Sequence, residues 1–200
     1  VHAVSSELYE QTLTQQLSNK ISTSDRIVIT DKKGKLTARN IATDMSTGNI
    51  IVSTDADVIY PYHYLNTLLK PFQDPQTVGV DGSELDYSIP NVPGKLMSIN
   101  FYLQKKLLHS NRLYGRHSAY LKSAFNQTGK FDESINQMDL NQMVHEEEIE
   151  FGNRLSKLGK IVFQSNACCH HLGGQKVACR SGVASNNSCQ KYGIGIERFG

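Results

Sequence analysis

The stretch NIIVSTDAD, residues 49–57, gives the strongest indication of the fold. Its first part, Asn49–Ser53, is a short and mostly apolar run, which is typical of a strand inside a sheet rather than at its edge. Two carboxylates, Asp55 and Asp57, follow that run directly. Because open α/β sheets bind ligands at the carboxyl ends of their strands, this arrangement favours a binding site at these two residues.

Strands and helices are expected to alternate on both sides of this stretch. The other expected strands are Arg26–Thr30, Thr77–Val80, Gly115–Tyr120 and Ile161–Gln164. The expected helices are Ser5–Asn19, Leu36–Thr47, Tyr62–Leu69, Lys95–His109 and Glu146–Leu158. Two further segments are expected to be a loop, Ser83–Gly94, and a polar mobile stretch, Gln127–Leu140. This order predicts an α/β fold whose sheet is mixed and mostly parallel, with helices on both faces.

The composition fits one folded domain. Of the 200 residues, 38% are hydrophobic and 20% are charged, which supplies a core and excludes a disordered chain. The net charge of +2 gives no reason to expect nucleic acid as a partner. No apolar run approaches the roughly 20 residues that span a bilayer, so no transmembrane segment is expected. We expect a folded core at 1–172 and a flexible basic tail or flap at 173–200.

The cysteines are confined to the last 33 residues of the chain, at Cys168, Cys169, Cys179 and Cys189. Adjacent cysteines rarely bridge each other, and the chain is not cysteine-dense, so we expect mostly free thiols in a reducing compartment. This indicates a cytoplasmic location and leaves membrane association open. The alternative is a zinc site formed by these cysteines with His170 and His171, although the spacing matches no common finger or ribbon.

Asp55 and Asp57 have the chemistry of a divalent-metal site. Two carboxylates one residue apart supply hard oxygen ligands, which suit Mg²⁺ or Mn²⁺. Such a cation keeps open positions for phosphate oxygens and neutralises a diphosphate as it leaves. The alternative is a polar turn in which one Asp caps the next helix. His170 and His171 follow the last expected strand, and the residues alone leave open whether one of them completes a metal shell or is structural.

A second group of carboxylates, Glu146–Glu148, opens the last expected helix. The helix dipole favours negative charge at this end, which is a sufficient structural reason for them. At about 100° per residue, however, Glu147 and Glu148 flank the apolar stripe that begins at Phe151, while Glu146 points away. An inward carboxylate with like-charged neighbours suits a general base. The spacing does not choose between Glu147 and Glu148.

Taken in order, these pieces resemble the family-2 inverting glycosyltransferases of the GT-A fold. The similarity extends from about Arg26 to His171 and lies in short blocks whose order and spacing agree with the family. The blocks are Thr37–Asn40 with Thr47–Gly48, Ile50–Asp57, Gly115–Ala119 with Gly129–Glu133, Glu147–Phe151 with Arg154–Leu155 and Gly159, and Ala167–His171.

The resemblance implies a role for each matching position. Asp57 would bind Mn²⁺ or Mg²⁺ directly, and Asp55 would contact the ribose or a metal-bound water. Glu148 stands where the family has its catalytic Asp and would be the general base, with Glu147 as the other candidate. His171, in preference to His170, would be the remaining metal ligand. Arg39 and Asn40 would line the nucleotide site or brace it, and Arg116 would contact the diphosphate or the acceptor.

The same resemblance implies the partners. The donor would be a nucleotide-diphosphate sugar, with a UDP-sugar the commonest choice in the family, and the acceptor a glycan, lipid or protein. The chain has no tryptophan, so it lacks the Q-x-x-R-W motif of processive synthases, and transfer of a single sugar is expected. The family normally begins with a strand–helix–strand unit that binds the base. Here only Val1–Val4 precedes the first expected helix, so that unit is expected to be largely missing.

Two other functions remain open from the sequence. A non-catalytic module would recognise a glycan or partner without turnover, and it would show no metal-dependent nucleotide binding. A nucleotidyltransferase would also use paired carboxylates and a metal, but it normally carries a Gly-rich basic loop near its start, which is not seen here.

Overall fold

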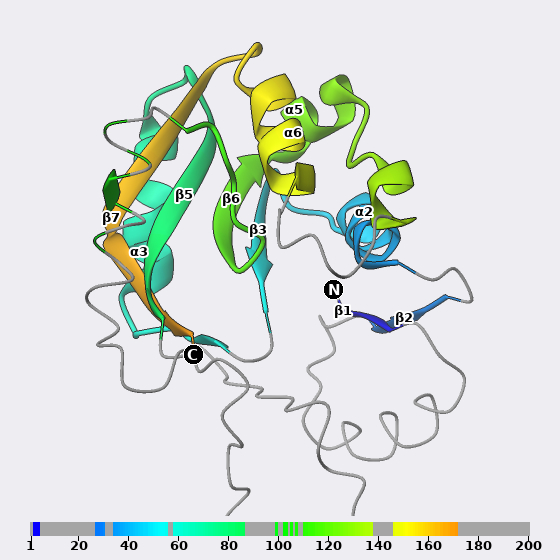
Figure 1. The fold of residues 1–200 in the computed structure, drawn as a ribbon, viewed down its shortest axis with the longest axis horizontal. Coiled ribbons are helices and arrows are strands. Elements are labelled where there is room, and N and C mark those ends of the chain that lie inside the picture. Colours follow the sequence, from blue (N-terminus) through cyan, green and yellow to red (C-terminus); the bar gives the residue numbers. More distant parts are fainter. Residues whose placement is uncertain are drawn as a thin grey trace, which may run out of the picture.

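A mixed five-stranded sheet forms the centre of the molecule in the computed structural model (Figure 1). The structure describes residues 2–4, 27–30, 34–55, 58–86, 99, 102, 103, 105, 107, 110–137 and 146–171. The strand order is β3-β6-β5-β7-β4, with bounds Ile50–Thr54, His117–Leu121, Thr77–Asp86, Lys160–His171 and Val58–Ile59. The neighbours β5 and β7 run parallel, and the other three neighbouring pairs are antiparallel. The predicted α/β class with a mixed sheet is confirmed.

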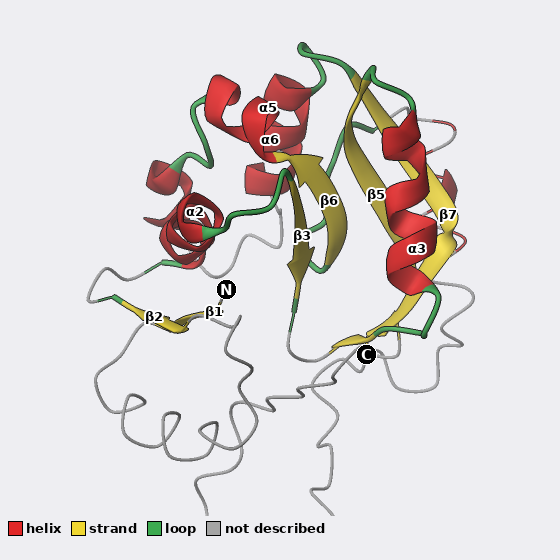
Figure 2. Cartoon of the chain, turned by 180° about the vertical axis from the view of Figure 1, so that it is seen from behind, coloured by secondary structure: helices red, strands yellow, loops and turns green. Residues whose placement is uncertain are grey.

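Helices lie on both faces of this sheet, as predicted. Figure 2 shows α3 (Tyr64–Leu69) across the face of β5 and β7. The helices α2 (Lys35–Met45), α5 (Lys122–Thr128) and α6 (Glu146–Leu155) lie on the other side. None of the described helices is long and apolar enough to cross a bilayer.

Each face of the sheet has its own apolar core, because successive strand residues point to opposite faces. Tyr120 of β6 packs with Phe125, Phe131 and Phe151 under α5 and α6. Its neighbour Ala119 belongs to the second core, under α3, with other buried residues such as Tyr64, Leu68, Val80 and Cys169. The two cores hold the helices against the sheet and so fix where their ends lie relative to the strand ends.

A small parallel sheet stands apart from the main one. It consists of β1 (His2–Val4) and β2 (Ile27–Ile29), with His2 opposite Ile27. The residues before the first expected helix therefore form a strand that pairs with the next one. That helix, Ser5–Asn19, and the expected tail at 173–200 lie outside the described residues.

Several expected boundaries were wrong. The expected loop begins inside β5, which continues to Asp86, and β7 extends from Lys160 to His171. These two strands pair with each other along most of their length, and this pairing outweighs the polar composition of their second halves. The expected mobile stretch contains the end of α5, terminated by Gly129 at φ 86°, and a 3₁₀ helix, η2, at Glu133–Gln137.

Candidate active site

The candidate site lies at the edge where β3 ends and β6 begins. These strands are antiparallel, with Thr54 opposite His117, so the carboxyl end of β3 meets the amino end of β6. Asp55, which follows β3, therefore lies beside the turn at Gly115–Arg116. Its partner in the sequence motif, Asp57, lies outside the described residues.

Asp55 is held by contacts from its side chain and its backbone. Its carboxylate is 3.5 Å from the guanidinium of Arg39, which comes from α2, and its side chain remains 43% exposed. Its backbone N–H donates to the Tyr60 hydroxyl at 3.3 Å, and that hydroxyl donates to the Arg116 carbonyl at 2.5 Å. A carboxylate fixed in this way and still open to solvent is available to a ligand.

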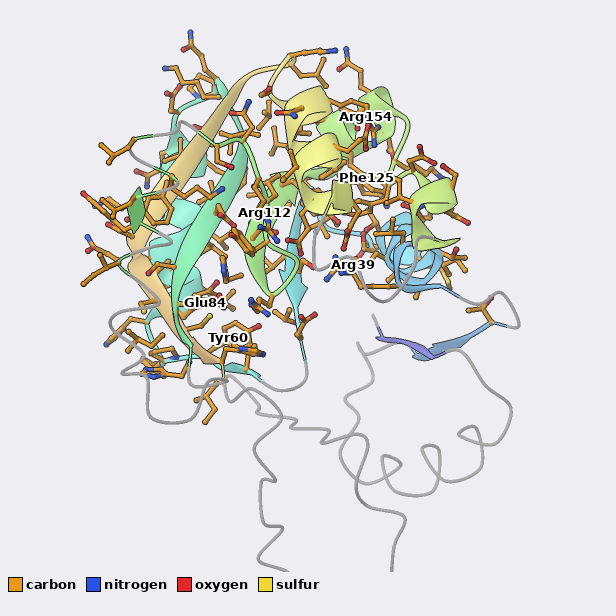
Figure 3. The ribbon with its side chains drawn as sticks, viewed as in Figure 1. Arg39, Tyr60, Glu84, Arg112, Phe125 and Arg154 are labelled. Carbon is orange, nitrogen blue, oxygen red and sulfur yellow. The ribbon has the colours of Figure 1, made fainter. Side chains whose placement is uncertain are left out.

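Glu148 approaches the same edge from α6. It is buried, with 4% of its surface exposed, and it shares a helix face with Phe151 and Leu155. One carboxylate oxygen accepts from the Gly115 N–H at 2.9 Å, and the other accepts from Arg112 Nε at 3.0 Å. The Arg112 guanidinium also lies over the Tyr114 ring, 3.9 Å from its centroid, and Figure 3 shows it over β6.

Glu147, the other candidate, has different surroundings. It forms an ion pair with Lys35 at 2.5 Å, on the side of α6 that faces the start of α2. The structure thus brings Asp55, Arg39 and Glu148 together around Gly115, with Arg39 in the space between α2 and β3 (Figure 3). Glu147 is directed toward α2 instead.

His170 and His171 lie at the end of β7, beside the start of β4. Val58 is opposite His171 and Ile59 is opposite His170. Since β4 begins one residue after Asp57, the histidines lie next to the strand that leaves the Asp-x-Asp motif. Carboxylate oxygens suit Mn²⁺ or Mg²⁺, and an imidazole nitrogen is a ligand of transition-metal ions, so a set of both would suit Mn²⁺ better than Mg²⁺.

The zinc alternative gains no support from the described cysteines. Among the residues described, no group of three or more His, Cys, Asp or Glu is close enough to hold a metal. Cys169 is buried in the core under α3, and this burial raises the pKa of its thiol well above the usual range. The Cys169 side chain therefore packs in an apolar core, away from any group of other metal ligands in the described part of the chain.

Arg116 and Asn40 are engaged with protein groups. Arg116 forms a two-pronged contact with Glu84, at 2.6 Å and 3.0 Å. The Asn40 amide donates to the Phe131 carbonyl and accepts from the Phe131 N–H, both at 3.0 Å, and it also donates to Glu133 at 2.9 Å. Asn40 thus ties α2 to the segment after α5.

Sequence reasoning missed a group of buried charged residues under this edge. Asp81 and Glu84 of β5 are both buried, and the imidazole of His117 lies 3.2 Å from one and 3.7 Å from the other. Lys105 forms an ion pair with Asp81 at 2.8 Å. The only signal was the presence of three acidic residues, Asp81, Glu84 and Asp86, in the VGVDGSELD run, which was assigned in part to a loop.

Comparison with known proteins shows the family and the fold of the chain. The profile described as Glycosyl transferase family 2 matches residues 11–134. A mannosyltransferase from Pyrobaculum calidifontis, in complex with GDP-Man and Mn²⁺, is 18% identical with a TM-score of 0.64 over 87% of this chain and 47% of that one. GalNAc-T7 with UDP, GalNAc and Mn²⁺ is 16% identical with a TM-score of 0.54 over 83% of this chain and 35% of that one.

These likenesses show the fold, and the predicted GT-A fold is confirmed by them. This chain spans about half the length of the mannosyltransferase and about a third of GalNAc-T7. No curated protein sequence matches it.

Proposed function

We propose that this chain, which belongs to glycosyl transferase family 2, transfers one sugar from a nucleotide-diphosphate sugar to an acceptor hydroxyl and inverts the anomeric carbon. The observation that carries the proposal is the position of two carboxylates on either side of Gly115. Asp55 is exposed at the end of β3, and Glu148 hydrogen-bonds the Gly115 N–H from α6. The Asp55 carboxylate is suited to the donor side of the site and the Glu148 carboxylate to the acceptor side.

The donor side would hold a divalent cation, Mn²⁺ or Mg²⁺. Asp57 would be its direct ligand, with Asp55 beside it and His171, or else His170, as the remaining ligand. The register of β4 with β7 supports this set, because it puts His171 opposite the residue after Asp57. Both structural relatives contain Mn²⁺ with a nucleotide. When bound, the metal supplies positive charge for the leaving diphosphate.

The chain's own residues would carry out one displacement. Arg39 orients Asp55 and adds positive charge near the diphosphate. Glu148 takes the proton of the acceptor hydroxyl, whose oxygen forms a bond to the anomeric carbon as the bond to the diphosphate oxygen breaks. Each Glu148 oxygen accepts one hydrogen bond from the described residues, and a carboxylate oxygen has two lone pairs, so an acceptor site remains. A single displacement of this kind inverts the anomeric centre.

The proposal also names candidates for the nucleotide base of the donor and for the class of acceptor. A UDP-sugar is the first candidate, and GDP is the second because one structural relative was solved with GDP-Man and the other with UDP. The acceptor would be a glycan, a lipid or a protein.

Calorimetric titration of UDP and of GDP, with Mn²⁺ and with EDTA, tests the donor site. We expect binding that needs both the metal and Asp57, and that disappears in Asp57→Asn. Binding that survives EDTA would remove the metal from the proposal. A chain that binds neither nucleotide would favour a non-catalytic module.

Substitution Glu148→Gln tests the base. Because general base catalysis contributes about 10²–10⁴-fold, transfer should fall by that factor while metal-dependent nucleotide binding is kept. Glu147→Gln is the matched control, since it removes the neighbouring charge together with the ion pair to Lys35 and leaves Glu148 in place. If Glu147→Gln loses transfer and Glu148→Gln keeps it, the assignment of the base is wrong.

A further inference from the structure

We infer that Gly115 is a positioning residue, which holds the Asp55 side of the site and Glu148 in a fixed relation for transfer. The inference rests on the proposed function and adds a residue that touches neither the metal nor the reacting atoms. Among the described residues of the site, Gly115 is the one that is contacted both from the Asp55 side, by Ser53 and Arg39, and by Glu148.

The backbone of Gly115 is fixed on two sides by hydrogen bonds. Its N–H donates to Glu148 Oε1 at 2.9 Å. Its carbonyl accepts from the Ser53 hydroxyl at 2.5 Å, and Ser53 lies on β3 two residues before Asp55. A shift of this peptide would therefore move Glu148 relative to the end of β3.

A third contact explains why this position is a glycine. The Arg39 guanidinium lies in the space that a Cβ at Gly115 would occupy. The backbone angle φ of Gly115 is not in the left-handed region, so its conformation alone does not require glycine. The missing side chain is required by Arg39, whose guanidinium reaches Asp55 across this space.

The consequence of adding a methyl group follows from what it would meet. The overlapping atoms are the far end of a long flexible side chain and not backbone. Alanine at this position would therefore push the Arg39 guanidinium away and leave the fold in place. Asp55 would lose its cation, and with it the contact that fixes its carboxylate relative to Glu148.

The test combines nucleotide binding, transfer kinetics and thermal unfolding of Gly115→Ala. We expect nucleotide affinity in the presence of Mn²⁺ to fall by about the factor that Arg39→Ala costs. At saturating donor, kcat should fall by up to about 10²-fold, because a displacement of about 1 Å at a reacting group has that effect. The midpoint of thermal unfolding should change little.

Two other glycines are matched controls. A Cβ at Gly48 would meet its nearest atom at an ordinary 3.4 Å, so Gly48→Ala should behave as the parent chain. A Cβ at Gly159 would come within 2.5 Å of the Gln76 carbonyl oxygen, beside the start of β5 and away from the site, so Gly159→Ala should lower the unfolding midpoint without lowering kcat. If kcat in the Gly115 and Gly159 variants follows stability alone, the positioning role is excluded.

A double-mutant cycle with Arg39→Ala isolates the contact. Once the guanidinium is absent, Gly115→Ala should weaken nucleotide binding little further, whereas independent effects would multiply. Multiplying losses, or a Gly115→Ala chain with the parent kcat and affinity, would overturn the inference. If the parent chain binds no nucleotide, the proposed function itself fails, which is a different result from a parent that binds and a variant that does not differ.

Discussion

At the scale of single residues, Glu147 and Glu148 show how one step along a helix changes the role of a carboxylate. Glu148 lies three and seven residues before Phe151 and Leu155, so it shares their inward face. Glu147 is turned about 100° away and meets Lys35. Spacing alone left the choice between them open. The difference comes from the loop before β6, where the Gly115 N–H and Arg112 both donate to Glu148.

The Tyr60 hydroxyl is the contact that we expect to matter most for the position of Asp55. It accepts from the Asp55 N–H and donates to the Arg116 carbonyl, so it joins two strand ends. Tyr60→Phe removes only this oxygen. At about 1 kcal/mol for a net hydrogen bond, nucleotide affinity in Mn²⁺ should fall about fivefold in calorimetry. Tyr62→Phe, at an exposed tyrosine two residues away, is the control. Equal affinities in both variants would show that Asp55 holds its position without the Tyr60 hydroxyl.

Part of the arrangement around the candidate site was predictable from the sequence, and the rest was not for a physical reason. Asp55 follows a short apolar strand, which is a local pattern, and its place just after the strand end was predicted correctly. The expectation that this strand lies inside the sheet was wrong, because β3 is the outermost of the described strands of its sheet and is only partly buried. The contacts of Arg116 with Glu84 and of Asn40 with Phe131 join residues 32 and 91 positions apart. Such contacts depend on the tertiary arrangement, and no local pattern indicates them.

At the scale of elements, α6 and the loop before β6 form one unit. Asn111 packs on Gly152 so closely that a Cβ at Gly152 would overlap its backbone, and the Leu113 N–H donates to the Glu148 carbonyl at 3.3 Å. The loop therefore lies along the helix and delivers Arg112 and Gly115 to the Glu148 side chain. The position of the candidate base depends on this packing as much as on the helix itself.

We expect Gly152→Ala to disturb that unit. Alanine in a helix gains about 1 kcal/mol over glycine, but overlap with fixed backbone costs about 1–3 kcal/mol, so the free energy of unfolding in urea should fall by up to about 2 kcal/mol. Transfer should fall as well, because the loop that carries Arg112 moves. The control is Asn153→Ala, whose side chain is exposed and bonds Asn111 at 3.3 Å. A Gly152→Ala chain more stable than its parent would mean that the loop does not lie on α6 in solution.

The helices α2, α3 and α6 and the strand β3 were predictable at this scale because their patterns are local, whereas α5 was not predicted. The ends of β5 and β7 were not. Their register shifts between Asp81 and Ser83, where a bulge lets the parallel pairing continue to Asp86 and His171. This irregularity interrupts the alternation on which a strand is recognised, although it brings His171 beside the start of β4.

At the scale of the whole molecule, buried tyrosines in both cores make the stability of the fold depend on pH. Burial is the main cause that raises the pKa of Tyr64 under α3, of Tyr114 to about 12 near the site, and of Tyr120 under α5. The folded chain therefore holds these phenols protonated at a pH where the unfolded chain, with a tyrosine pKa near 10, has released the protons. The unfolded state binds fewer protons above pH 10, so stability is complete below about pH 10 and is lost as pH rises beyond it.

Tyr64→Phe separates the cost of a buried hydroxyl from the value of the ring. The Tyr64 hydroxyl is buried and has no hydrogen-bond partner among the residues described. An unsatisfied buried polar group costs about 1–3 kcal/mol, so the variant should be more stable than the parent by about 1 kcal/mol at pH 7 in urea unfolding. Above pH 10 the difference should widen by up to about 1.4 kcal/mol per pH unit, because the variant lacks the proton that the unfolded parent releases. Tyr120→Phe is the matched control, because the Tyr120 hydroxyl is 3.2 Å from the Thr43 hydroxyl. This variant should be less stable than the parent at pH 7, and its stability should also fall less steeply above pH 10. A Tyr64→Phe chain that is less stable at pH 7 would mean that the hydroxyl is hydrogen-bonded in solution, and the packing of α3 on the sheet would then include a polar contact.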